Sequence, residues 1–200
     1  MQSIQTVSEN TIYVGASDRR LAKFENLFPI PRGVSYNAYV ILDEKTALLD
    51  TADASVGAQF LENVAAALDG RKLDYLIVDH MEPDHAAMIE AVLVRWPDLR
   101  LVVNAKTLPM LKMYFPTDSA AIDDALVVKE GDTLDLGKHK LTFVMAPMVH
   151  WPEVMMTFDT TTGTLFSADA FGTFGALDGA LFADEVDFAG KWLDDARKVY

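Results

Sequence analysis

Four side chains that can bind a metal ion lie within six residues of one another, between His80 and His85. The run reads His-Met-Glu-Pro-Asp-His and so offers two imidazoles and two carboxylates. In an extended loop His80, Glu82 and Asp84 would point to one side, because successive side chains alternate. Pro83 stiffens this run and keeps the residue before it out of the helical region. Donors at this spacing indicate a metal site, and the alternative is a solvated acidic loop.

Two further donors occupy similar positions later in the chain. His150 follows the apolar segment 141–145 and Asp169 follows the segment 164–167, so each comes after a predicted strand. Taken alone, a lone histidine is more often structural, and an aspartate can equally well cap a helix or close a turn. Three loops at strand ends can nevertheless converge on one edge of a sheet sandwich, and an aspartate in an apolar stretch needs a partner. We therefore include both residues in the candidate metal site.

The absence of cysteine narrows the choice of ligands. No cysteine occurs in the 200 residues, which excludes disulfides, thiolate ligands and cysteine nucleophiles within them. Any metal would then be held by His, Asp and Glu. The remaining histidine, His139, lies in the polar sequence 137–140, which predicts a hairpin turn. We expect its side chain to be exposed and to take no part in the site.

Strands and helices alternate in the first half of the chain. Strands are predicted at 11–14, 35–42, 46–49, 75–78 and 101–103, the second and third forming a hairpin. Helices are predicted from Val56 to Leu68, from Ala86 to Trp96 and from about Ala105 to Tyr114. Ser55 is available as N-cap of the first helix and Gly70 lies just past its end. This order predicts a twisted sheet covered by helices.

The sequence of the second half predicts a β-meander that is followed by a helix. Short strands are expected at 126–128, 140–145, 154–158 and 164–167. From Phe182 to Tyr200 the apolar residues recur at alternating steps of four and three, which predicts one amphipathic helix. Because this helix would reach the last residue without a cap, we expect the native polypeptide to continue beyond it.

Composition bounds the class of protein. Half of the residues are hydrophobic, and with neither a repeat nor a linker in view we expect one domain over residues 1–200. The formal net charge of −13 opposes binding to nucleic acid or to an anionic membrane, because both would repel the chain. We find no signal peptide and no apolar run long enough to span a membrane, so we expect a cytoplasmic location.

Five segments spread over almost the whole chain resemble one protein family. They are residues 35–39, 48–51, 80–85, 146–152 and 165–172. The family is that of the flavodiiron proteins, whose iron module has the metallo-β-lactamase fold. Glu82 distinguishes them, because hydrolytic members of the fold usually carry a second histidine at that position. The resemblance implies an α/β fold, a metallo-β-lactamase-like αβ/βα sandwich that is incomplete at its C-terminus.

The resemblance also implies a role for each candidate donor. Two irons would be bridged by Asp169, with His80, Glu82 and His150 on one and Asp84 and His85 on the other. The family pattern further includes one more histidine ligand and a C-terminal flavodoxin-like domain that binds flavin mononucleotide (FMN). No histidine follows His150 in this chain. The simplest expectation is a chain that lacks these parts, with FMN supplied by another domain or by a partner.

The activity implied is the reduction of dioxygen or nitric oxide at a non-haem di-iron site, with electrons from a flavin. A flavodoxin-like or rubredoxin-like protein would donate the electrons, and a head-to-tail homodimer would bring flavin and iron together. Met148 and Trp151, which flank His150, would line a dry pocket for the gas, although simple core packing is the more frequent role of such residues. Asp50 would orient the ligand loop, with structural hydrogen bonding as an equal alternative.

Two other activities suit similar donors. A metallo-hydrolase would generate hydroxide at two zinc ions, and a sensor would bind oxygen at iron without turnover. Nitrogen and oxygen ligands fit iron, zinc and manganese alike, so the residue types alone leave the metal open. The extra carboxylate of Glu82 favours a harder, redox-capable metal, and we therefore prefer the di-iron reductase over the hydrolase.

Overall fold

A seven-stranded sheet forms the centre of the protein in a computed structural model that describes residues 3–116 and 119–199. Its strands, in spatial order, are β1 (Gln5–Ser8), β2 (Thr11–Tyr13), β7 (Tyr39–Leu42), β8 (Thr46–Leu49), β9 (Tyr75–Ile77), β10 (Arg100–Asn104) and β11 (Leu126–Val128). The last four run parallel to one another, whereas the first three pair antiparallel. Parallel strands end at the same edge of a sheet, so the residues that follow β8 and β9 are brought together there.

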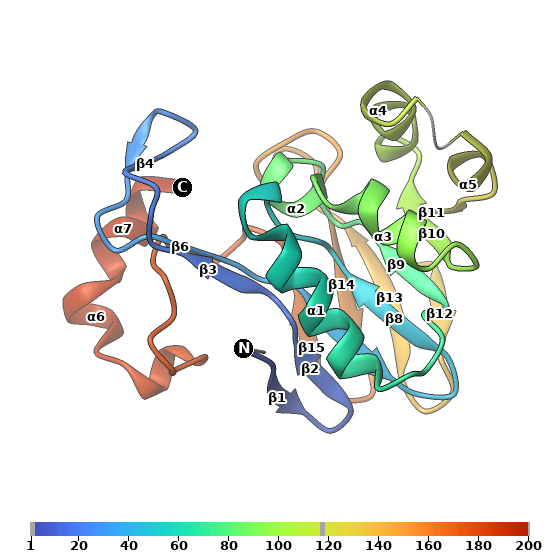
Figure 1. Cartoon of the computed structure of the whole chain (residues 1–200), viewed down its shortest axis with the longest axis horizontal. Coiled ribbons are helices and arrows are strands. Elements are labelled where there is room, and N and C mark those ends of the chain that lie inside the picture. Colours follow the sequence, from blue (N-terminus) through green and yellow to red (C-terminus); the bar gives the residue numbers. More distant parts are fainter. Residues whose placement is uncertain (1–2, 117–118, 200) are drawn as a thin grey trace.

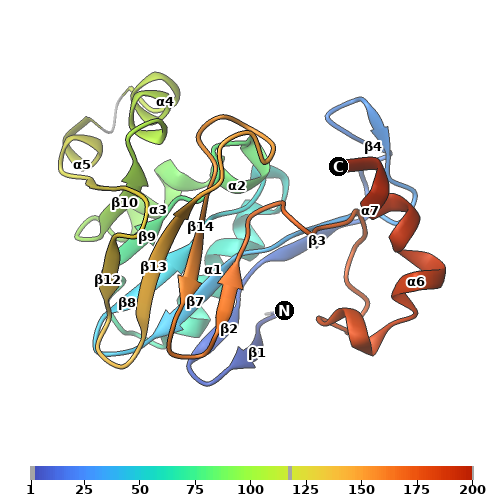
Figure 2. The same cartoon turned by 180° about the vertical axis from the view of Figure 1, so that it is seen from behind.

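A second, antiparallel sheet faces the first. It consists of β12 (Thr133–Asp135), β13 (Lys140–Met145), β14 (Met155–Asp159) and β15 (Thr164–Phe166). Figure 2 shows this sheet in front of the larger one, as a meander. The space between the two sheets is filled by inward-facing residues of both, among them Leu49, Ile77, Leu141, Phe143 and Met155. Three of the predicted strands of the second half are confirmed as β13, β14 and β15, with ends that agree to within one residue. The segment 126–128 is a strand as predicted, but it is β11 at the edge of the large sheet, and the meander contains β12, which was not predicted, in its place.

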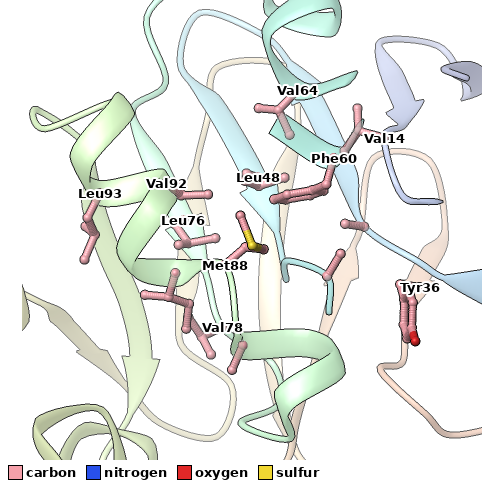
Figure 3. Packing of buried hydrophobic residues seen from close by; sticks show 14 of the residues in the cluster. Val14, Tyr36, Leu48, Phe60, Val64, Leu76, Val78, Met88, Val92 and Leu93 are labelled. Atoms are coloured by element: carbon pink, nitrogen blue, oxygen red, sulfur yellow. The ribbon is translucent and has the colours of Figure 1, made fainter. Parts of the chain in front are cut away.

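Helices cover the other face of the large sheet. They are the 3-10 helix η1 (Ala54–Val56) and the α-helices α1 (Gly57–Leu68), α2 (Pro83–Ala86), α3 (Ile89–Arg95), α4 (Thr107–Tyr114) and α5 (Ser119–Asp123). Figure 1 shows α1, α2 and α3 lying across the strands. In Figure 3 the side chains of Phe60, Val64 and Val92 point toward Leu48 and Leu76 of the sheet. Helices on one face and a second sheet on the other give the layered sandwich that the sequence predicts.

Replacing Phe60 by alanine should strongly destabilise the fold. The side chain is fully buried between α1 and the sheet. Its removal deletes a large apolar group and leaves a cavity, which lowers the free energy of unfolding by about 3–5 kcal/mol. Denaturant unfolding of Phe60→Ala beside Val94→Ala, whose side chain is exposed on α3, measures this difference. Equal midpoints for the two variants would contradict the packing described.

Two short antiparallel strand pairs, one nested within the other along the chain, form an arm beside the sandwich together with the C-terminal residues. Strand β3 (Ala16–Asp18) pairs with β6 (Val34–Tyr36), and β4 (Lys23–Phe24) pairs with β5 (Phe28–Pro29). Figures 1 and 2 show α6, α7 and β4 grouped at one end of the molecule, away from α1 to α5. Arg32 joins the pieces, because its guanidinium lies 4.6 Å from the centre of the Trp192 ring and pairs with Asp195. The predicted single strand 35–42 is thus divided between the arm and the sheet.

The single helix predicted from Phe182 to Tyr200 is wrong. The structure has η2 (Ala183–Glu185), α6 (Phe188–Lys191) and α7 (Leu193–Val199) instead, and Tyr200 lies outside the described residues. Val186 is extended and breaks the run, and the side chain of Asp187 caps α6 by accepting a hydrogen bond from the Gly190 nitrogen at 3.1 Å. Acidic side chains that bond the nearby backbone compete with helix formation, and the apolar periodicity does not register this competition.

The cap of the first helical segment also differs from the prediction. The side chain of Asp53, rather than Ser55, is the N-cap, and it accepts a hydrogen bond from the Ser55 nitrogen at 2.8 Å. At the C-terminal end Asp69 already adopts the left-handed conformation that Gly70 continues.

Within the described residues, every helix is too short or too polar to span a lipid bilayer.

Candidate metal centre

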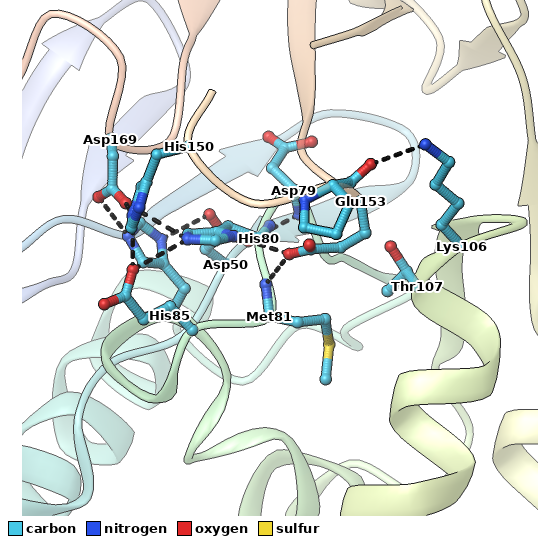
Figure 4. A network of polar contacts seen from close by, with 12 residues as sticks. Asp50, Asp79, His80, Met81, His85, Lys106, Thr107, His150, Glu153 and Asp169 are labelled. Carbon is cyan, nitrogen blue, oxygen red and sulfur yellow. Dashed lines mark hydrogen bonds and ion pairs between the residues drawn. The ribbon is translucent and has the colours of Figure 1, made fainter. Parts of the chain in front are cut away.

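The six candidate donors meet at one edge of the sandwich. Strand β9 leads into the loop of His80 and Glu82, which continues into α2 with Asp84 and His85. His150 lies in the loop between β13 and β14, and Asp169 follows β15. Figure 4 shows the histidine rings and Asp169 turned toward one another. The expected convergence of strand-end loops is thus present in the structure.

The first donor group consists of His80, Glu82, His150 and Asp169. The Glu82 Oε2 atom lies 3.1 Å from His80 Nε2 and 2.8 Å from His150 Nε2. Asp169 Oδ2 lies 3.1 Å from His150 Nε2 and 3.3 Å from His80 Nε2. One ligand atom from each of the four residues falls within 4.8 Å of the others, which is compact enough for a single ion to contact all four.

The second group consists of Asp84, His85 and Asp169. His85 Nε2 lies 2.9 Å from Asp169 Oδ1 and 3.7 Å from Asp84 Oδ2. Asp169 thus offers one oxygen to each group. Among the described residues, the buried Oδ1 atom of Asp84 has no hydrogen-bond partner. A buried carboxylate oxygen without a partner is costly, and a cation would remove that cost.

Two buried acids orient the imidazoles. Glu153 Oε1 lies 2.8 Å from His80 Nδ1, and Asp50 Oδ2 lies 2.9 Å from His85 Nδ1. Each contact fixes the ring so that its other nitrogen, Nε2, faces the remaining donors of its group. This arrangement is typical of histidines that bind metals. Asp50 also accepts a hydrogen bond from the Asp79 nitrogen at 2.7 Å, which ties β8 to the ligand loop. Glu153 was not predicted as part of the site, and its position three residues after His150 is the only signal for it in the sequence.

Without a metal, protons hold this cluster of opposite charges together. Burial lowers the pKa of His80, but hydrogen bonds with Asp169, Glu153 and Glu82 raise it to about 11. Burial likewise lowers the pKa of His85, and the charge of Asp84 with hydrogen bonds to Asp169 and Asp50 raises it well above its ordinary value. Burial would raise the pKa of Asp169, yet its histidine partners lower it. The His80 ring is therefore protonated at neutral pH, and an incoming cation must displace this proton.

Binding of a divalent ion should weaken as the pH falls. Because His80 stays protonated at every pH below about 11, one proton must leave this ring for each ion that binds there. The apparent affinity for the first ion should then fall at least about tenfold for each pH unit between about pH 8 and pH 6. Cobalt titrations at constant ionic strength measure this slope. An affinity that does not change with pH would show that His80 is not a ligand.

One cavity of about 180 Å³ opens onto both donor groups. Its opposite wall comes from the arm, where the Phe174 ring lies 5.2 Å from the Phe24 ring and 5.9 Å from the Phe28 ring. An aromatic wall over polar donors suits a small apolar molecule. Met148 and Trp151 do not line this cavity. Met148 is 69% exposed, and the Trp151 ring packs edge-on against His80 at 5.3 Å between centres.

The prediction that His139 is exposed is wrong. Its side chain is buried, and its Nδ1 atom lies 2.8 Å from Asp159 Oδ2 at the end of β14. The backbone nitrogen of His139 donates to Asp43 Oδ2 at 2.6 Å, which ties this segment to the turn between β7 and β8. Neither donor group found among the described residues includes this histidine. His139 is therefore a structural residue at the opposite end of the sandwich from the donor groups.

The donors present fit a pair of divalent ions that share a carboxylate. They are imidazole nitrogens and carboxylate oxygens only, which bind iron, manganese and zinc. The shared position of Asp169 and the unpartnered oxygen of Asp84 each leave room for a cation bond. The fit is unequal, because the first group has four donors and the second has three.

Residues 34–193 match the family described as "ODP family beta lactamase". The chain belongs to this family. The match begins at β6 and ends within α7, so it includes all six candidate donors. Membership of the ODP family accounts for the lactamase-like layers described above.

Curated relatives of this ODP-family chain are nitric oxide reductases. The nitric oxide reductase of Moorella thermoacetica is 37% identical over 196 residues, which are 97% of this chain and 48% of that protein. The anaerobic nitric oxide reductase flavorubredoxin of Klebsiella pneumoniae is 38% identical over 183 residues, which are 90% of this chain and 37% of that protein. The chain therefore spans half or less of the length of these relatives.

Solved structures show the same fold. The flavodiiron protein from Giardia intestinalis aligns with a TM-score of 0.91 at 27% identity, over 100% of this chain and 47% of that one. The rubredoxin oxygen:oxidoreductase of Desulfovibrio gigas aligns with a TM-score of 0.91 at 30% identity, over 99% of this chain and 48% of that one. The resemblance to flavodiiron proteins seen in the sequence, and the fold that it implies, are thereby confirmed.

Proposed function

We propose that this chain is the di-iron module of an oxidoreductase that reduces nitric oxide or dioxygen with electrons from a flavin. The observation that carries the proposal is the pair of donor groups that share Asp169 and open onto one cavity. The names of the relatives, nitric oxide reductase and rubredoxin oxygen:oxidoreductase, support the same reaction class. When bound, two ferrous ions would supply electrons to a small diatomic molecule.

The residues of the chain would contribute three things to this reaction. The first group would hold one iron through His80, Glu82 and His150, the second would hold the other through Asp84 and His85, and Asp169 would bridge them. The aromatic wall of Phe24, Phe28 and Phe174 would keep bulk water from the cavity while admitting apolar gases. Glu153 and Asp50 would hold the imidazoles in the tautomer that a metal needs.

The cofactor and partners belong to the same proposal. FMN would come from a domain or partner beyond these residues, and a flavodoxin-like or rubredoxin-like protein would supply its electrons. A head-to-tail homodimer would place that flavin near the cavity. We also propose a cytoplasmic location. The names flavorubredoxin and rubredoxin oxygen:oxidoreductase support a donor of the rubredoxin type.

A single-turnover experiment tests the proposal against its alternatives. The chain is loaded anaerobically with ferrous iron and mixed with dissolved nitric oxide or dioxygen while iron oxidation and gas consumption are followed. We expect consumption in proportion to bound iron, and none with zinc-loaded chain. Reversible gas binding without consumption would favour the sensor. Ester or thioester hydrolysis by zinc-loaded chain, without any gas consumption by the iron form, would favour the hydrolase.

A further inference from the structure

The hairpin β4–β5 brings one more carboxylate, that of Glu25, to the cavity of the metal centre. Glu25 lies in the turn of this hairpin, which is closed by a hydrogen bond from the Leu27 nitrogen to the Phe24 oxygen at 2.9 Å. Its side chain lines the same cavity as the two donor groups and reaches it from the wall that the arm provides. None of the roles described so far uses this carboxylate.

Contacts place Glu25 beside the first donor group. Burial raises the pKa of the Glu25 carboxyl group, the charge of Glu82 and a hydrogen bond with Glu82 raise it further, and the charge of His150 lowers it. Glu82, His150 and Asp169 are three of the four residues of the first group. Two carboxylates in contact need a proton or a cation between them, because bare anions repel each other. A metal ion at the first position would meet that need for both.

The backbone of the turn gives an independent indication. Glu25 and Asn26 both have positive φ, at 48° and 57°. Asparagine tolerates this left-handed conformation, whereas glutamate gains nothing from it, so the turn itself is not a reason for glutamate at this position. A residue held in an unfavourable conformation at the edge of a polar cavity points to a task for its side chain.

We propose that Glu25 is a further ligand of the first metal position, supplied across the cavity by the β4–β5 hairpin. The inference rests on the proposed function, because it assumes the metal pair. With Glu25, two imidazoles and three carboxylates would surround the first position, a set that favours iron or manganese over zinc. Metal binding would also fasten the hairpin, so that Phe24 and Phe28 are fixed over the cavity.

Cobalt titration with visible spectroscopy tests the proposal without any enzymatic turnover. Cobalt replaces iron at nitrogen and oxygen sites, and its visible bands depend on the number and type of its ligands. In Glu25→Gln the first equivalent should bind at least about tenfold more weakly, and the bands of the saturated protein should change. Glu62→Gln, which alters an exposed glutamate of α1, should leave affinity and bands as in the wild type.

A second variant separates loss of a ligand from damage to the turn. Glu25→Asn removes the charge and suits the left-handed conformation better than glutamate does. It should therefore fold at least as well as the wild type, as judged by thermal unfolding of the metal-free chain, and still show altered cobalt bands. Saturated spectra identical to the wild type in both variants would overturn the proposal, even with reduced affinity, because Glu25 would then act only through Glu82. Failure of the wild-type chain to bind cobalt would instead overturn the proposed function.

Discussion

An Asp169→Asn variant should lose metal binding at both positions. Asp169 Oδ1 lies 2.9 Å from His85 Nε2, and Oδ2 lies 3.1 Å from His150 Nε2, so each oxygen serves one donor group. An asparagine of the same shape removes the negative charge and places an amide group, which donates, at one of the two oxygen positions. Loss of a supporting residue behind a ligand already costs about 10–100-fold in metal affinity, so loss of this shared ligand should exceed about 100-fold at each position.

Anaerobic equilibrium dialysis with ferrous iron, followed by metal analysis, measures this loss. The matched control is Asp98→Asn, which makes the same change at an exposed aspartate after α3. We expect the control to bind iron as the wild type does. If Asp169→Asn retained one equivalent at wild-type affinity, its carboxylate would belong to one group only, and the shared position inferred from the two distances would be incorrect.

The elements of the sandwich were predictable because short-range patterns determine most of them. Phe60, Val64 and Leu68 recur at helical spacing, and all three are buried against the sheet. The run 75–78 is apolar throughout, as expected for a parallel strand with both faces covered, and its core Tyr75–Ile77 is β9. What the patterns could not reveal was where the arm lies, since its hairpins pair over a few residues and its placement depends on distant contacts such as Arg32 with Trp192.

Donors close together in the sequence were also predictable, whereas their distant supports were not. The segment from His80 to His85 shows its chemistry locally. Glu153 and Glu25 look like ordinary surface acids in the sequence, and only the tertiary structure brings them to His80 and to Glu82. Because the two partners of such a contact are far apart in the sequence, no characteristic residue spacing marks them. The metal centre therefore contains more acids than its motif indicates.

His139 illustrates the opposite error. Lysines flank it on both sides, and such a segment normally lies in solvent. In the structure Lys138 and Lys140 pair with exposed acids, while the ring between them turns inward to Asp159. Alternation of side chains at the start of a strand permits this, because neighbours point to opposite faces. The inward orientation of the His139 ring is set by its buried partner, Asp159, which lies in the next strand of the sheet, β14.

Ferrous iron should bind to this chain in two unequal steps. Four donors surround the first position and three surround the second, and no histidine follows His150 that could add to the second. Each ligand bond adds to affinity and holds the others in place, so a position with fewer ligands binds more weakly. We expect the first equivalent to bind at least about tenfold more tightly than the second. Anaerobic titration against a competing chelator resolves the two steps.

Two isosteric variants assign the steps to the groups. Glu82→Gln should weaken the tight step, because Glu82 Oε2 lies within 3.1 Å of both His80 and His150 and belongs to the first group alone. Asp84→Asn should weaken the second step and leave the first near its wild-type affinity, since Asp84 belongs only to the second group. Each variant is thus the control for the other. Two equivalents of equal affinity in the wild type, or the same loss in both variants, would show that the donors do not divide into two positions around Asp169.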